Sequence, residues 1–184
     1  MNNNCIKDQI KDNIQKLFDI FNIPKTDSNA DTPGRVSKML INELFIGLNK
    51  RKFPKYKMFK FQSNKNEPEP IIIENIDIYS ICEHHLLPFT GKATFKYVPK
   101  DKVIGLSKIP RIIDFLARKP QLQEKLTDEI FETFCKILDT NSVSIKLKCE
   151  HMCVKMRGIK DGCILTTSKN GGIFQQIYSN KHDE

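Results

Sequence analysis

The chain has 184 residues and a mass of 21.3 kDa, which is the length of one domain with room for an extension. Its composition of 39% hydrophobic and 28% charged residues excludes wholesale disorder, and 8 glycines with 9 prolines exclude collagen-like chains. The net charge of +8 fits either solvated lysines or an anionic partner such as a phosphate compound or nucleic acid. No apolar run approaches the ~20 residues of a membrane span. The first residues also lack a signal-peptide stretch, so we expect a cytoplasmic protein.

The first part of the chain predicts helices. Residues 6–22 carry apolar side chains at helical spacing, and a second helix is expected from Asp31-Thr32-Pro33 to about Leu48. Asp31 or Thr32 can serve as its N-cap, because Pro33 suits the first helical position. Residues 49–70 are polar, rich in lysine and interrupted by Pro54, Pro68 and Pro70, which is typical of a connector. We therefore expect a helical extension with its connector over residues 1–70 and the main domain over 71–184.

The main domain predicts strands and helices in the order ββααββ. Strands are expected over residues 71–80, 92–98, 142–154 and 162–168, because β-branched or alternating apolar residues occur there. Between the second and third strand, one helix is expected to begin at Ser107 and another at Pro120. This order suggests an α+β fold, an antiparallel four-stranded sheet with two helices on one face.

Cysteine and histidine gather at the ends of two predicted strands. Cys82 and His85 follow the first strand, and a turn there can direct both side chains to one ion. The third strand has an apolar face that continues from Cys149 to His151 and Cys153. Two cysteines and one histidine would leave a fourth zinc position for water, the arrangement of catalytic sites. The alternative at this point is that these residues are ordinary buried thiols and a hydrogen-bonded histidine.

A second cluster suggests an anion site. Ser107 and Lys108 open a predicted helix with Arg111 one turn later, and a helix N-terminus offers free N–H groups and partial positive charge. Arg157 is a further candidate cation for this site, as are two residues one turn apart on the second predicted helix, Arg35 and Lys38. Solvated basic residues on a capped surface helix are the alternative.

Gln123 and Glu124 lie in the first turn of the next predicted helix. The helix dipole alone favours a carboxylate there. The alternative is that Glu124 accepts paired hydrogen bonds from a guanine-like edge.

Longer motifs resemble the GTP cyclohydrolase I family. They are Thr32-Pro-Gly-Arg-Val-Ser-Lys-Met39, Cys82-Glu-His-His-Leu-Leu-Pro-Phe89, Val103-Ile-Gly-Leu-Ser-Lys-Ile-Pro-Arg111, Arg118-Lys-Pro-Gln-Leu-Gln-Glu-Lys-Leu-Thr127 and Glu150-His-Met-Cys-Val-Lys-Met-Arg-Gly158. The resemblance covers roughly residues 6–175. One segment departs from the family, because residues 160–168 hold fewer Ser and Thr than is usual there.

The resemblance implies a T-fold and a zinc-dependent hydrolase that converts GTP and water to 7,8-dihydroneopterin triphosphate and formate. This reaction is the first step of pterin and folate-type biosynthesis. The implied assembly is a ring-forming homo-oligomer, typically a homodecamer, with active sites at subunit interfaces. No nucleic-acid or membrane partner is expected.

The resemblance also assigns roles to residues. It gives zinc to Cys82, His85 and Cys153 and proton transfer to His84 and His151. It places the guanine at Gln123 and Glu124, and the ribose triphosphate at Ser107, Lys108, Arg111 and Arg157. Arg35 and Lys38 would reach the phosphates across a subunit interface.

Two rival functions remain at this stage. A non-catalytic T-fold zinc protein could bind a pterin or a protein partner, although structural zinc would not need His84, His151 and Glu124. A basic nucleic-acid-binding protein would be retained on DNA in a salt-dependent way and would release no formate from GTP.

Overall fold

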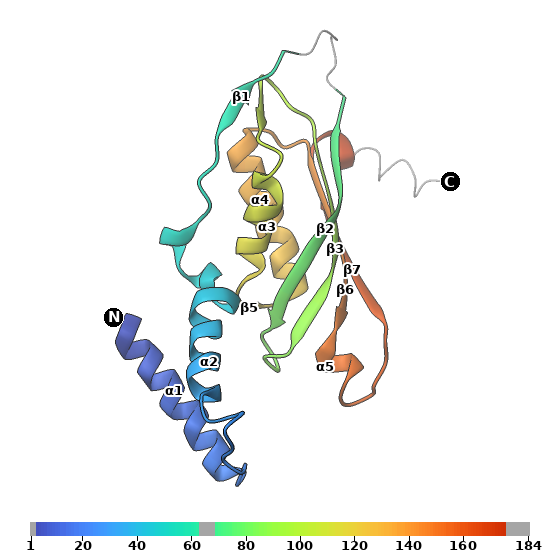
Figure 1. The fold of residues 1–184 in the computed structure, drawn as a ribbon. Helices are drawn as coiled ribbons and strands as arrows, with labels where there is room; N and C mark the ends of the chain where they lie inside the picture. Colours follow the sequence, from blue (N-terminus) through green and yellow to red (C-terminus); the bar gives the residue numbers. More distant parts are fainter. Residues whose placement is uncertain (1–2, 63–68, 176–184) are drawn as a thin grey trace.

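The computed structural model describes residues 3–62 and 69–175 (Figure 1). Pro68 of the predicted connector and residues 176–184 of the predicted main domain lie outside these ranges. No helix in the described ranges is long and apolar enough to cross a membrane. The described residues after 70 contain β2 (Ile71–Cys82), β3 (Pro88–Tyr97), β4 (Lys102–Ile104), α3 (Lys108–Ala117), β5 (Pro120–Gln121), α4 (Gln123–Leu138), β6 (Val143–His151), α5 (Met152–Lys155) and β7 (Ile164–Asn170).

The main sheet confirms the mixed α+β class and corrects the number of strands. Its strand order is β5-β2-β3-β6-β7, so it has five strands and not the expected four. The neighbours from β2 to β7 are antiparallel, whereas β5 runs parallel to the end of β2. The extra strand is the segment Pro120–Gln121, which was expected to begin a helix. Two residues carry no periodic signal, so only the pairing with β2 reveals this strand.

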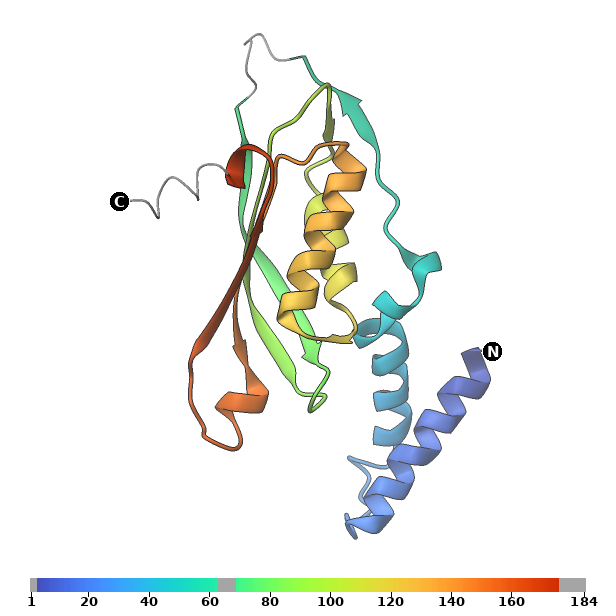
Figure 2. The same cartoon turned by 180° about the vertical axis from the view of Figure 1, so that it is seen from behind.

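Helices α3 and α4 cover one face of this sheet (Figures 1 and 2). The core forms between the sheet and these two helices. Inward-facing residues of neighbouring strands are opposite each other there, as Phe95 is opposite Ile145. The Phe95 ring also packs on Phe134 of α4, with ring centroids 4.4 Å apart. All three side chains are fully buried, and each such burial is worth about 1.5–3 kcal/mol. The core therefore fixes the positions of β2 and β6, whose ends carry the candidate site.

The N-terminal part forms a helical hairpin that extends away from the sheet (Figures 1 and 2). The second predicted helix is shorter than expected: α2 ends at Met39, and a π-helical turn and a 3₁₀ turn continue the chain to Leu48. The chain turns here to approach α3, since the Gly47 amide donates to the Arg118 carbonyl oxygen at 2.9 Å. A Cβ at Gly47 would lie 2.4 Å from the Phe115 oxygen, so this close approach requires glycine. The elements of this part are α1 (Asn3–Ile20), α2 (Thr32–Met39), η1 (Leu40–Leu44), η2 (Ile46–Leu48), η3 (Lys50–Lys52) and β1 (Met58–Lys60).

The predicted connector contains regular structure that the sequence did not predict. Strand β1 pairs antiparallel with β4 as a separate two-stranded sheet, in which Met58 is opposite Ile104. This pairing carries residues 55–57 over the loop that precedes α3. The division at residue 70 stays a prediction.

Candidate active site

The loop between β2 and β3 places Cys82 and His85 together. The Cys82 amide donates to the Leu87 oxygen at 2.8 Å, and the Leu86 amide donates to the Cys82 oxygen at 2.9 Å. Leu86 has a positive φ of 53°, which allows this tight turn. The turn brings side chains three positions apart to one side, as the sequence required for a shared ion.

Cys153 reaches the same place by a different route from the one expected. The predicted strand over 142–154 ends at His151, and Cys153 lies in the single helical turn α5. The last β3–β6 pair is Phe89 with His151, and β3 begins one residue earlier at Pro88. The described residues offer β6 no pairing partner beyond His151, and the chain turns there. This turn, and not strand alternation, brings Cys153 to Cys82.

The ligand atoms of Cys82, His85 and Cys153 all lie within 4.8 Å of one another. The two sulfur atoms are 3.7 Å apart, much farther than the ~2.05 Å of a disulfide. Zinc–sulfur bonds of ~2.3 Å at a tetrahedral angle would separate two sulfurs by about 3.8 Å, so the donor set fits zinc. Burial and the neighbouring Cys82 sulfur raise the pKa of the Cys153 thiol, whereas Arg157 lowers it. A bound cation would relieve the cost of two adjacent thiolates.

His151 ends β6, two residues before Cys153, and its ring is held on two sides. Its ring stacks on Phe89 with centroids 4.6 Å apart and an interplanar angle of 10°. Its Nε2 atom lies 3.0 Å from Gln123 Oε1. Burial lowers the pKa of His151, and the charge of Glu124 opposes that shift. Burial therefore favours the neutral form of the His151 imidazole. His84, in contrast, is exposed, and its ring centroid lies 6.3 Å from that of His85.

The two residues expected to bind a guanine edge differ in position. Gln123 is fully buried, and contacts within the chain occupy its amide. Glu124 is exposed at the start of α4, and the described residues offer it no hydrogen-bond partner. The next residue, Lys125, forms an ion pair with Glu83 at 3.1 Å, which ties α4 to the loop that carries His85. Of the two expected contacts, only the Glu124 side chain is free for a ligand.

The N-terminus of α3 carries the expected anion-binding residues. Ser107 is the N-cap residue, yet its hydroxyl forms no capping hydrogen bond. Ser107 and Lys108 line a cavity of about 450 Å³. Sequence reasoning missed Lys55 and Lys57, which line the same cavity because β1 pairs with β4. Their position within a lysine-rich connector was the only available signal, and it did not distinguish them from solvated lysines.

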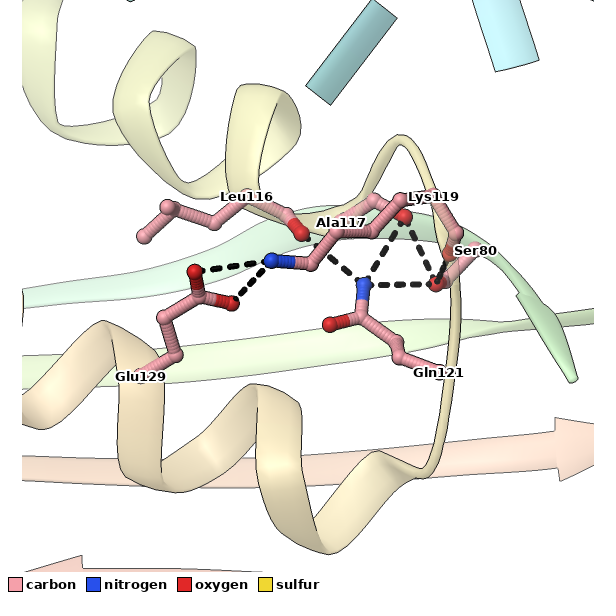
Figure 3. A network of polar contacts seen from close by, with 6 residues as sticks. All are labelled: Ser80, Leu116, Ala117, Lys119, Gln121 and Glu129. Carbon is pink, nitrogen blue, oxygen red and sulfur yellow. Dashed lines mark hydrogen bonds and ion pairs between the residues drawn. The ribbon is translucent and has the colours of Figure 1, made fainter. Parts of the chain in front are cut away.

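A polar network attaches the other end of α3 to the strand that carries Cys82 (Figure 3). Ser80 Oγ donates to the Ala117 oxygen at 2.6 Å, and Gln121 Nε2 donates to the Leu116 oxygen at 2.8 Å. Gln121 is paired with Cys82 in the β2–β5 register. The C-terminal end of α3 therefore lies beside Cys82.

In the same network, Lys119 forms an ion pair with Glu129 of α4 at 2.6 Å (Figure 3). This pair links the segment after α3 to the middle of α4. Two helices and the end of β2 are thus connected by side chains next to the candidate metal ligands.

A single chain brings together only part of the predicted site. Since α3 has 10 residues, Ser107 lies roughly one helix length, about 15 Å, from the end beside Cys82. Arg157 is on the metal side, close enough to influence Cys153. Arg35 is on α2, where its Nη2 donates to the Ser28 oxygen at 2.7 Å, and Lys38 is exposed on the same helix. The chain thus has a metal-side cluster and a separate anion-side cluster.

Comparison with known proteins identifies related sequences. The profile of the family described as GTP cyclohydrolase I matches residues 10–183. A protein of Yersinia pseudotuberculosis serotype O:1b (strain IP 31758), named GTP cyclohydrolase 1, is 39% identical over 179 residues, covering 96% of this chain and 80% of that protein. Proteins of the same name from Wigglesworthia glossinidia brevipalpis and Escherichia coli O1:K1 / APEC are 44% and 37% identical. These two alignments cover 88% and 100% of this chain and 75% and 82% of the relatives.

Proposed function

The chain belongs to the GTP cyclohydrolase I family, and from that membership we propose that it converts GTP and water to 7,8-dihydroneopterin triphosphate and formate. The observation that carries the proposal is the group of Cys82, His85 and Cys153, with His151 two residues before Cys153 at the end of β6. Proton-transfer groups next to three metal donors suit the hydrolytic opening of a ring C–N bond.

Cys82, His85 and Cys153 would hold a zinc ion. The S···S distance of 3.7 Å and the mixed sulfur and nitrogen donors support this metal. When bound, zinc would act as a Lewis acid that lowers the pKa of water near C8 of the guanine. The remaining chemistry is assigned to side chains of the protein.

His151 and His84 would move protons as the imidazole ring of the guanine opens. Burial lowers the pKa of His151, which favours the neutral ring. A neutral imidazole can accept a proton as a base and return it as an acid in a later step. Glu124 would accept hydrogen bonds from the guanine edge, because its carboxylate is exposed beside His151. Gln123 would contribute from behind His151, since its own amide is occupied.

The basic residues would hold the ribose triphosphate, which the reaction does not cleave. Ser107, Lys108 and Arg111 would bind phosphate at the N-terminus of α3, with Arg157 on the metal side. Holding the triphosphate in place also lowers the barrier to opening the ribose ring and reclosing it onto the pyrimidine, because the reacting atoms stay in position.

The complete site would form between subunits of a ring of T-fold chains, typically ten in this family. The separation of the anion-side cluster from Cys82 supports this arrangement, because one chain does not bring all the groups together. Arg35 and Lys38 of α2 would complete the phosphate site of a neighbouring subunit. The projecting helical hairpin of α1 and α2 is suited to such an exchange (Figure 1).

The direct test is incubation of the zinc-loaded protein with GTP. Formate release and a new pterin chromophore, in equal amounts, are the expected result. Zinc binding with neither product would favour the non-catalytic alternative and contradict the proposal.

A further inference from the structure

A chain of hydrogen bonds runs from His151 through Gln123 to two threonines that the proposed reaction does not use. Gln123 Nε2 lies 3.1 Å from the Leu165 oxygen and 3.0 Å from Thr167 Oγ1. Thr167 Oγ1 lies 2.7 Å from Thr127 Oγ1, and Thr127 Oγ1 donates to the Gln123 backbone oxygen at 2.8 Å. The chain thus joins β6, α4 and β7.

The direction of each hydrogen bond in this chain is determined. The Leu165 carbonyl oxygen is only an acceptor, so the Gln123 atom that faces it must be the NH₂ group. Thr127 has one hydroxyl proton and donates it to the backbone carbonyl oxygen of Gln123. Thr167 must therefore donate its own proton to Thr127. Thr167 then accepts from the second N–H of Gln123. With both N–H groups in use, Gln123 directs its Oε1 atom at His151.

An amide oxygen only accepts hydrogen bonds, so the proton between Gln123 and His151 belongs to His151 Nε2. A neutral imidazole carries one ring proton, and the other nitrogen, Nδ1, is then an acceptor. The described residues offer no hydrogen-bond partner to Nδ1. Phe89 holds the plane of the ring by stacking on it.

We propose that Thr167 is a positioning residue that, with Thr127, fixes the amide of Gln123 so that His151 Nε2 donates to Gln123 Oε1 and Nδ1 is the ring nitrogen left for the substrate. In the alternative tautomer, the proton is on Nδ1 and Nε2 is an acceptor. The Gln123 amide would then have to be reversed, so that its NH₂ group faces His151. Its Oε1 would then face the Leu165 oxygen, and two acceptors would be placed about 3.1 Å apart. Thr167 favours the observed orientation of the amide, because its hydroxyl oxygen accepts from Gln123 Nε2 while its proton is donated to Thr127.

The proposal rests on the proposed function only for the role of Nδ1, because the tautomer itself is independent of any reaction. The proposal also gives a role to Thr167, which lies in the segment of residues 160–168 that is poor in Ser and Thr. Thr167 is half-buried and faces α4, whereas its neighbour Thr166 is exposed. The two threonines therefore form a matched pair for mutation.

The kinetic test compares Thr167→Val, Thr167→Ser and Thr166→Val in the zinc-loaded enzyme. Loss of a neutral hydrogen bond corresponds to roughly a three- to tenfold effect. We expect Thr167→Val to lower kcat by about that factor with KM for GTP and zinc content unchanged, and Thr167→Ser to restore it. Thr166→Val should behave as the unmodified protein. If Thr167→Val and Thr166→Val have the same kcat, Thr167 does not position His151.

The structural test is ¹⁵N NMR of the zinc-loaded protein labelled at histidine, with the His151 signals identified by their loss in His151→Ala. We expect a protonated Nε2 and an unprotonated Nδ1, and a mixture of tautomers in Gln123→Met. A protonated Nδ1 in the unmodified protein would overturn the inference while leaving the proposed function intact. The predicted tautomer in a protein that produces no formate would contradict the proposed function alone.

Discussion

The sulfur atoms of Cys82 and Cys153 lie 3.7 Å apart, although 71 positions separate the two residues in the sequence. The last residue of β2 supplies one sulfur, and the helical turn after β6 supplies the other. This distance matches two ligands of one tetrahedral zinc ion and defines the first prediction.

Cys153 and His151 should have separable roles although they are near neighbours. Cys153→Ser should lose both zinc and turnover, because it removes one of three protein ligands. His151→Ala should keep about one zinc per subunit and still bind GTP, yet turn over at least ~10²-fold more slowly. Metal analysis and formate release on the purified variants check this, and a zinc-free His151→Ala protein would make His151 a ligand.

The α3 N-terminus should recognise phosphate and not guanine. Lys108→Ala or Arg111→Ala should weaken GTP binding about tenfold or more, because charge-assisted contacts are worth roughly 1.5–3 kcal/mol each. Guanosine binding, measured by calorimetry, should change little. Lys136→Ala on the exposed side of α4 is the matched control. Equal losses for both ligands would show that the triphosphate binds elsewhere.

Two inactive variants should restore activity to each other if subunits share a site. Lys38→Glu removes a cation of α2 and Cys153→Ser removes a metal ligand. In mixed oligomers, about a quarter of sites would combine an intact α2 from one subunit with an intact metal group from its neighbour. Formate release from oligomers assembled from equal amounts of both variants measures this. No recovery, or a fully active monomer of about 21 kDa in light scattering, would contradict a shared site.

The contacts of Ser80 and Gln121 with the end of α3 should contribute unequally to stability. Ser80 is buried, and its hydroxyl donates to the Ala117 oxygen at 2.6 Å. Ser80→Ala should lower the free energy of unfolding by about 1 kcal/mol, since Gln121 Nε2 still donates to the same oxygen at 3.2 Å. Gln121→Leu should cost about 1–3 kcal/mol, because the Leu116 oxygen then loses its side-chain donor. Urea unfolding at one protein concentration tests both, with exposed Ser168→Ala as the control.

Cysteine alkylation should distinguish buried from exposed thiols. Burial raises the pKa of Cys149 to about 12, so its thiol is protonated and unreactive even at pH 9. Cys5 and Cys163 are exposed and should react quickly with iodoacetamide under the same conditions. Mass spectrometry of the zinc-loaded protein checks this. Rapid labelling of Cys149 before unfolding would contradict its place in the core.

The sequence by itself determined the elements with clear periodicity and the residues with distinctive chemistry. The alternation from Val143 to Cys149 predicted β6, and the spacing of Leu126, Ile130 and Phe134 predicted α4, because each pattern buries one face. The residue types at Cys82, His85 and Cys153 nominated a metal site before any contact was known. These inferences depend only on local order along the chain.

Tertiary structure decided the features that depend on contacts between distant segments. Cys153 reaches Cys82 through a helical turn, because β6 loses its pairing partner after His151. Likewise, the Gln123 amide is directed at His151 because Leu165 and Thr167 of β7 occupy its N–H groups, while its expected contact with the guanine stays a prediction. A hydrogen bond has a direction only when both partners are placed, and the packing of β7 against α4 supplies that information.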